Sequence, residues 1–454
     1  MSSALHVLRS RKVWLIPGAL LAVALGLITV LFTGSVADPG ADMRDAPIGI
    51  VSLDAGAKAG GGTLNLGARV VTGITAQPQH PRKVEWKTYS SLAEVKRQIG
   101  RNKLWTAIVL PKDYSARMLS LTGPHPVKPA VTVLTNRGGG AMSTSIGTAT
   151  ARKAATAASA HAAGALVEQA RKAGHAVSPA NRVLLGDPVV VREQPGAPLG
   201  ERTGNGMTAF FYALLLTVGG FLSTNLIHAM TDANLGFAAT EFGPKRMTAL
   251  PQPISRLQTL LAKYAVMVGI ATVLSSVILA VATFAVHLDL PHSALLWLFG
   301  VLSVSAVGIG ALTVIAALGS PGIVAALLIF VAAAVPTSGG AIPLQVMPPF
   351  WRALASFEPL RAIADGVRAI IYYDAQSDAG LGRALVTLCV GVAVSLLAGL
   401  TITSFYDRKG LHRMHPHHLE RLRAFLHREQ HGAPGHDAEG RHRGSADGDP
   451  LPAP

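Results

Sequence analysis

Uncharged apolar runs, each about as long as a bilayer is thick, dominate this sequence of 454 residues. Residues 13–32, VWLIPGALLAVALGLITVLF, contain no charged side chain, and neither do residues 206–230, 264–286 and 384–406. A helix needs about 20 apolar residues to cross the hydrocarbon core. Such runs exclude an ordinary soluble fold and predict a polytopic α-helical membrane protein.

A longer uncharged stretch, residues 293–351, predicts two further spans. Glycine and proline interrupt it at GSPG (319–322) and again at PTSGG (336–340), and both are turn signals. The sequence therefore predicts six spans in all, at residues 13–33, 206–230, 264–286, 293–318, 321–341 and 384–406.

The first run has a second interpretation. Ser35-Val36-Ala37 offers the small residues of a signal-peptide cleavage site. The apolar run is 20 residues long, however, whereas the apolar region of a signal peptide is about 7–15 residues. We therefore predict an uncleaved membrane anchor.

The short segments between spans predict the orientation, because Lys and Arg accumulate on the cytoplasmic side. The N-terminal tail (1–12), the connection 231–263 and the tail 407–454 would share one face, and they carry thirteen such cations up to Arg428. The opposite short segments, 287–292 and 345–383, carry four. The bias predicts a multi-pass plasma-membrane protein with both termini in the cytoplasm.

Residues 34–205 would then form an extracytoplasmic domain between spans one and two. Four strand-like runs, IGIVSLD, VEWKTY, LWTAIVL and AVTVLT, alternate with helix-like segments, which predicts an α/β domain. Ser91 and Glu94 form a capping-box pattern at one helix start. Residues 141–176 are alanine-rich and predict one long helix or a helical hairpin, and VVVRE (189–193) would return the chain to the membrane.

The predicted outer domain is basic, with 21 Lys and Arg against 11 Asp and Glu. One interpretation is a solvated surface next to anionic lipid or cell-wall polymer. The other is a surface that guides an anionic substrate. The predicted location excludes nucleic acid as a partner.

Motifs for catalysis or for phosphate binding are absent, including G-x-x-x-x-G-K-[ST], H-E-x-x-H and G-x-S-x-G. We therefore predict no enzyme, no cofactor bound by this chain and no metal site. The predicted spans contain no Asp, Glu, Lys or Arg, which disfavours an ion-coupled pump. His228 and Asn225 share a helical face and predict an interhelical hydrogen bond or an interfacial histidine. The eight histidines of the tail favour a solvated segment over a metal site.

The connection after the second span, TDANLGFAATEFGPKRMTALPQPISRLQTLLAKY, is basic and broken by prolines. Charge alone favours a connecting loop that fixes topology, with Ser255 as the cap of the next helix. The order of its residues resembles the corresponding loop of type-2 ABC exporter permeases, which contacts the ATPase subunit. The resemblance implies ATPase contacts at Glu241, Gly243, Arg246, Arg256 and Lys263. Phe242, Gly243 and Pro244 depart from the arginine and the Gly-Thr pair that are common in that family.

The layout of one span, a large outer domain and five spans resembles the phage-infection-protein-like branch of that superfamily. RNKLWTAIVLPKDYSARM (101–118) is similar to a phrase of its outer domain. Residues 338–374 are similar to the segment before the last span in its actinobacterial-type members.

Within the outer segment 342–383, residues 350–373 place apolar side chains at spacings of three and four. The pattern predicts an amphipathic helix in the outer membrane interface, or a gate at the outer mouth. A helix packed against the bundle or the outer domain is the alternative. The residues that carry the prediction are Trp351, Phe357, Arg361, Asp365 and Arg368.

Together these features predict the membrane-spanning permease subunit of an exporter for a lipid-like or amphipathic cargo. A separate ABC-type ATPase would use the ATP, and two permease chains, identical or homologous, would form the pathway in contact with membrane lipid. The alternative is a non-transporting receptor or scaffold of the cell envelope.

Overall fold

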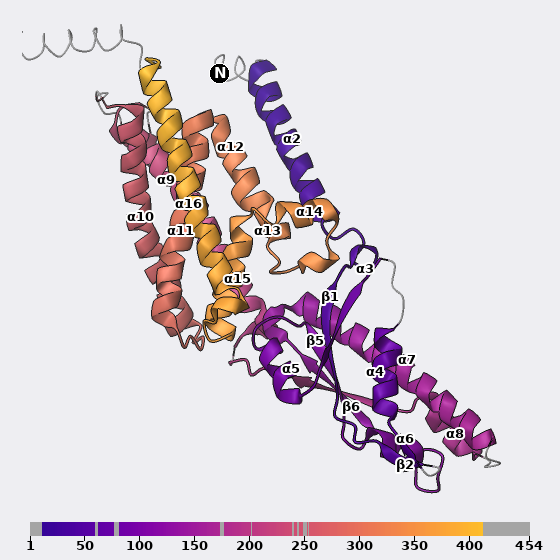
Figure 1. Cartoon of the computed structure of the whole chain (residues 1–454). Helices are drawn as coiled ribbons and strands as arrows, with labels where there is room; N and C mark the ends of the chain where they lie inside the picture. The colour runs from indigo at the N-terminus through magenta and orange to yellow at the C-terminus, as the bar shows by residue number, and fades with distance from the viewer. Residues whose placement is uncertain are drawn as a thin grey trace, which may run out of the picture.

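The computed structural model describes residues 11–59, 62–76, 81–172, 177–200, 202–237, 240–242, 245–247, 252 and 254–411. Over these residues the chain forms a helical bundle with a separate α/β domain at one end (Figure 1). Helix α2 (Arg11–Gly34) precedes the domain, and all other helices of the bundle follow it.

Four helices of the described chain are long and apolar enough to cross a membrane: α9 (Met207–Asn234), α10 (Arg256–Ala280), α11 (Ser293–Leu318) and α16 (Leu381–Arg408). Helix α10 continues through a π-helical turn, η3 (Val281–Ala285). Two further apolar helices, Gly18–Gly34 within α2 and Pro321–Thr337, are shorter. The second of these consists of α12 (Pro321–Leu327), the π-helical turn η4 (Leu328–Ala332) and α13 (Ala334–Thr337). Six crossings therefore remain a prediction.

Helix α11 occupies the middle of the bundle and packs against α9, α10 and α16. Small residues make this close packing possible, because membrane helices gain little from apolar burial alone. A Cβ at Gly308 would lie 2.3 Å from the sulfur of Met267 on α10, and one at Gly220 would lie 2.9 Å from the Val304 carbonyl oxygen. A larger residue at position 220 would push α9 away from α11, because the obstacle is backbone. A larger residue at position 308 would require the Met267 side chain to move.

The α/β domain is built on a sheet of five strands with the order β4-β1-β5-β6-β7. Neighbouring strands are parallel except β5 and β6, which are antiparallel. The four predicted strands are confirmed as β1 (Ala46–Ser52), β4 (Val84–Tyr89), β5 (Thr106–Leu110) and β6 (Ala130–Thr135). A fifth strand, β7 (Val190–Pro195), forms in the segment that was predicted only to return the chain to the membrane. The inner strands β1 and β5 are almost wholly buried because helices cover both faces of the sheet, whereas the edge strand β7 is mostly exposed.

Helix α7 (Ala141–Lys172) is one continuous helix, which decides between the two alternatives left open for the alanine-rich segment. It packs on β5 and β6 and lies beside α4 (Leu66–Thr75) (Figure 1). The remaining short elements of the domain are α3 (Pro39–Asp42), β2 (Ala57–Ala59), β3 (Gly62–Leu64), α5 (Leu92–Ile99), α6 (Tyr114–Ser120) and α8 (Pro179–Gly186).

Two predicted helix caps are present. The Ser255 hydroxyl accepts the amide of Gln258 at the start of α10, and the Gln258 side chain accepts the Ser255 amide, which completes a capping box. At α5 the Ser91 hydroxyl accepts the amide of Glu94. The Glu94 carboxylate accepts the Ser90 hydroxyl, so the described bonds show only half of the predicted box there.

The predicted interfacial helix at 350–373 is wrong in two respects. The segment divides into α14 (Pro349–Leu354) and α15 (Pro359–Tyr372), because Pro359 lacks an amide and disfavours helix at the residue before it. Helix α15 packs against α9, α11 and α16, with its face of Arg361, Asp365 and Arg368 mostly turned inward. The alternative, a helix packed against the bundle, is confirmed. The short turns η5 (Leu344–Val346) and η6 (Ser377–Ala379) flank the two helices.

Candidate functional site

The end of the bundle away from the α/β domain carries a small hairpin between α9 and α10. Strand β8 (Thr240–Phe242) pairs antiparallel with β9 (Lys245–Met247), and Glu241 lies opposite Arg246. The structure thus pairs these two residues, both predicted to contact the ATPase, across the hairpin. Gly243 lies outside the described residues.

Arg256 makes its contacts with α16 and the residues after it. The backbone amides of Arg256 and Leu257, at the start of α10, each donate to the Asp407 carboxylate on α16, at 3.0 Å. A carboxylate is favoured there because the N-terminal end of a helix carries a partial positive charge. The Arg256 Nε donates to the Leu411 carbonyl at 2.6 Å, and the guanidinium lies over the Tyr406 ring. Arg256 therefore holds α10 to α16, and a role in partner binding would compete with these contacts.

Lys263 forms a buried charged cluster with Asp232 and His228 across α9 and α10. Its ammonium group is 2.6 Å from Asp232 Oδ1 and 2.9 Å from His228 Nδ1. The residue is 3% exposed, and its ammonium group is engaged within the chain, so its predicted contact with an ATPase stays a prediction. The predicted loop 231–263 is also too long, because α9 continues to Asn234 and α10 begins at Arg256. Asp232 and Lys263 therefore lie inside helices, on α9 and α10 respectively.

The interhelical hydrogen bond predicted for His228 is present, with Lys263 as its partner. Asn225 does not take part in it among the described bonds. Its side-chain amide donates to the Phe221 carbonyl of its own helix.

At the opposite end, buried polar contacts join α15 to the α/β domain. The Tyr373 hydroxyl, just after α15, is 2.8 Å from Asn136 Oδ1 and 3.2 Å from Asn102 Oδ1. Asn136 in turn donates to the Leu104 carbonyl at 2.9 Å. These contacts, together with the close approach of Gly206 and Arg137 described below, are called the joint here.

Arg368 fixes the position of α15 within the bundle. Its two terminal nitrogens donate to the carbonyls of Gly339 at 3.0 Å and Gly340 at 2.7 Å, in the turn after α13. The residue is 3% exposed. A buried guanidinium is stable where carbonyl groups receive its N–H groups, and those carbonyls would otherwise lack a donor.

Gly206 connects the joint to α9 through an unusual backbone conformation. It has a φ of +86°, and a Cβ there would lie 2.1 Å from the Arg137 carbonyl oxygen. Arg202, Gly204 and Asn205 also have positive φ. Only glycine satisfies both the left-handed backbone and this close approach.

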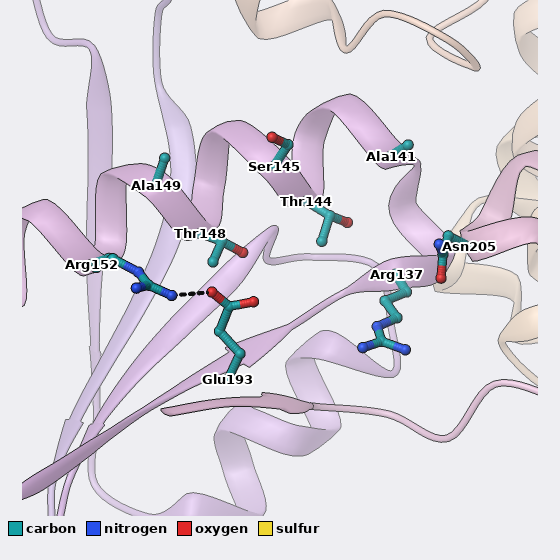
Figure 2. Close-up of a pocket in the computed structure, with 9 residues that line it drawn as sticks. All are labelled: Arg137, Ala141, Thr144, Ser145, Thr148, Ala149, Arg152, Glu193 and Asn205. Carbon is teal, nitrogen blue, oxygen red and sulfur yellow. Dashed lines mark hydrogen bonds and ion pairs between the residues drawn. The ribbon is translucent and has the colours of Figure 1, made fainter. Parts of the chain in front are cut away.

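A polar groove lies next to the joint, with a volume of about 620 Å³. Figure 2 shows Glu193 of β7 reaching to Arg152 of α7, with Arg137 and Asn205 toward the other end of the groove. The Thr148 hydroxyl, on the α7 wall, is buried without a hydrogen-bond partner. The groove offers hydroxyl and guanidinium donors. No cluster of three metal-ligating side chains occurs within the described part of the chain.

The other predicted residues of the outer segment occupy dissimilar environments. The Trp351 indole donates to the Leu31 carbonyl of α2 at 3.0 Å, and its ring covers Gly34. Phe357 is 84% exposed, in the break between α14 and α15. The structure therefore does not bring these two residues together with the buried charges of α15.

Sequence reasoning missed Asp232, Asp407 and Tyr373. The helix-capping role of Asp407 depends on the distant start of α10, which no local pattern reveals.

The buried carboxyl of Glu358, just before α15, makes the stability of the chain depend on pH in a way that can be measured. It is 5% exposed, and its Oε2 has no hydrogen-bond partner. Burial raises the pKa of this carboxyl from 4.5 to about 8. Between these values the folded chain holds a proton that the unfolded chain has released. The free energy of unfolding should therefore fall by up to about 1.4 kcal/mol per pH unit as pH rises through this window.

The Glu358→Gln variant should lose this slope in denaturant titrations between about pH 5 and pH 8. Its stability relative to wild type should rise by a few kcal/mol across the window. Glu168→Gln, at an exposed position, is the matched control and should follow wild type. Parallel curves for wild type and Glu358→Gln would refute a buried neutral carboxyl.

Comparison with known protein families gives one match. The family described as "Protein of unknown function (DUF3533)" matches residues 18–397. No curated protein matches the chain.

Proposed function

The chain belongs to the DUF3533 family, and we propose that it is the membrane-spanning permease subunit of an exporter for a lipid-like or amphipathic cargo. A separate ABC-type ATPase supplies the energy by docking on the β8–β9 hairpin. Two permease chains form the pathway. In this proposal the hairpin is cytoplasmic and the α/β domain lies outside, which the excess of Lys and Arg in the predicted short segments supports.

The observation that carries this proposal is that α9 has a fixed attachment at each end. At one end Gly206 lies against Arg137, and the Ala209 amide donates to the Tyr372 hydroxyl at 3.2 Å. At the other end α9 leads into the hairpin and is bound to α10 through Asp232 and Lys263. A rigid helix with both attachments transmits a displacement of the hairpin to the α/β domain. That is the coupling that an externally powered exporter requires.

Arg246→Glu should reduce recovery of an ATP-binding-cassette subunit when the tagged full-length chain is purified from its native membranes. Reversing the charge of Arg246 disturbs complementarity with a partner, so we expect roughly a tenfold loss. The measurement is the ratio of ATPase to permease by quantitative mass spectrometry.

Lys409→Glu is the matched control. Lys409 is an exposed cation that follows the last turn of α16, and it lies outside the hairpin. It should recover the ATPase as wild type does. If wild type recovers no ATPase, or if Arg246→Glu recovers it equally well, docking at the hairpin is wrong.

The alternative function is a non-transporting receptor or scaffold of the cell envelope. The exposed edge strand β7 supports it, because an unpaired edge can receive a strand from another protein. A receptor needs no ATPase, so the same purification separates the two functions.

A further inference from the structure

Two hollows lie end to end along one side of α7. One, of about 510 Å³, lies between α7 and β4 near Met43. The other, of about 750 Å³, lies between α7 and α4. Both are lined by Ala157, so the two hollows meet at this residue, and together they are called here the α4–α7 trough. The polar groove of Figure 2 involves other residues of α7, including Ala149 and Arg152.

The walls of the trough are mostly apolar, and many of the residues that line them are small. On α7 they include Ala154, Ala158 and Ala162, and on α4 they include Gly73. A Cβ at Gly73 would meet no atom within 4 Å, so no described residue fills the space next to it. An alanine-rich helix forms readily but leaves no large side chain to close such a gap. Methyl-lined walls of this kind suit an alkyl chain.

The rim of the trough is basic. Lys83 and Lys153 line one hollow, and Arg69 and His161 line the other. None of the described lining residues is acidic, in contrast to the groove of Figure 2, where Glu193 neutralises Arg152. An apolar trough with a basic rim is complementary to a molecule that has one alkyl chain and one anionic group.

One end of the trough lies at the bundle. Met43, which lines the nearer hollow, also packs in a cluster with Ile342 and Val346 from the segment after α13. The other end lies at Ala165, further along α7. The trough therefore begins beside the bundle and leads away from it along the domain.

We propose that the α4–α7 trough binds an anionic amphiphile, with its alkyl chain along the alanines of α7 and its phosphate or carboxylate group at the basic rim. The proposal rests on the proposed export function and names the chemical class of the cargo. The trough receives the cargo as it leaves the bundle.

Photo-crosslinking of the full-length chain in phosphatidylcholine nanodiscs tests this assignment. The probe is lysophosphatidic acid with a diazirine in its acyl chain, and peptide mass spectrometry locates the adducts. Wild type should be labelled on α4 and α7. Ala157→Trp fills the shared part of the trough and should lower this labelling on the order of tenfold. Ala149→Trp, an equal change at another exposed position of α7, should leave it unchanged.

Two further arms separate the head group from the chain. The Arg69→Gln/Lys153→Gln double variant should weaken labelling by lysophosphatidic acid roughly 3- to 10-fold and leave labelling by the matched lysophosphatidylcholine probe unchanged. Excess inorganic phosphate should compete only weakly, because it lacks the chain.

Equal labelling of the two tryptophan variants, or no adducts on α4 and α7 in wild type, would overturn the proposal. Complete competition by inorganic phosphate would also overturn it, since the site would then bind the anion alone. The labelling requires no ATPase. A failed ATPase recovery with intact trough labelling would therefore reject the proposed function without rejecting the binding site.

Discussion

Gly206→Ala is expected to prevent stable association of the α/β domain with the bundle. The new methyl group would lie 2.1 Å from the Arg137 carbonyl oxygen, which is backbone and cannot rotate away. A left-handed alanine alone costs about 1–2 kcal/mol, and displacing the joint adds to this cost, so we expect a loss of more than about 3 kcal/mol. Thermal unfolding in detergent, followed by size-exclusion chromatography, measures the loss.

Gly204→Ala provides the matched control. Gly204 also has a positive φ, of +54°, but its nearest obstacle is the Thr208 hydroxyl, at 3.3 Å. The control therefore carries the left-handed strain without the backbone collision and should lose only about 1–2 kcal/mol. Equal losses in the two variants would mean that the approach to Arg137 contributes nothing.

Lys263→Met is expected to cause the second large effect. Removing the ammonium group leaves the Asp232 carboxylate without its 2.6 Å partner in the interior of the bundle. Breaking a buried ion pair in this way costs about 3–5 kcal/mol, whereas replacing both charges with neutral groups is often close to neutral. The Asp232→Asn/Lys263→Met double variant should therefore recover most of the stability. Unfolding of the four proteins of this double-mutant cycle gives the coupling free energy.

The exposed Lys409→Met substitution controls for loss of a lysine as such and should stay within about 0.5 kcal/mol of wild type. If the double variant is no more stable than Lys263→Met, the two side chains do not act as a pair. The lysine would then stabilise the bundle through other contacts.

Local patterns were sufficient to predict four of the five strands of the main sheet and the Ser255 cap. Each depends on residues that are adjacent in sequence, such as the apolar run LWTAIVL before Pro111. The choice between one helix and a hairpin at 141–176 was not available from the sequence, because alanine favours helix without marking an end. The joint also escaped prediction, since Tyr373 and Asn136 are far apart in the chain.

Charged residues were the main source of error. Lys263 directly precedes an apolar run, which is typical of a cation at the end of a membrane span. Its partner Asp232 is 31 positions away in the sequence. Arg361, Asp365 and Arg368 have the spacing of a solvated face, yet Arg368 reaches buried carbonyls that the sequence does not place nearby. The break in this segment was predictable, because Glu358 precedes Pro359 and a residue before proline disfavours helix.

Helix α15 is held in different ways at its two ends. In its second half the Arg368 guanidinium donates to two carbonyls of the turn after α13. The Glu358 carboxyl has a pKa of about 8 and becomes charged in mildly alkaline surroundings. A charged carboxylate is costly in this buried position, so alkalinity would weaken the packing of the first turn of α15. The hydrogen bonds of Arg368 hold the second half of the helix and do not involve Glu358.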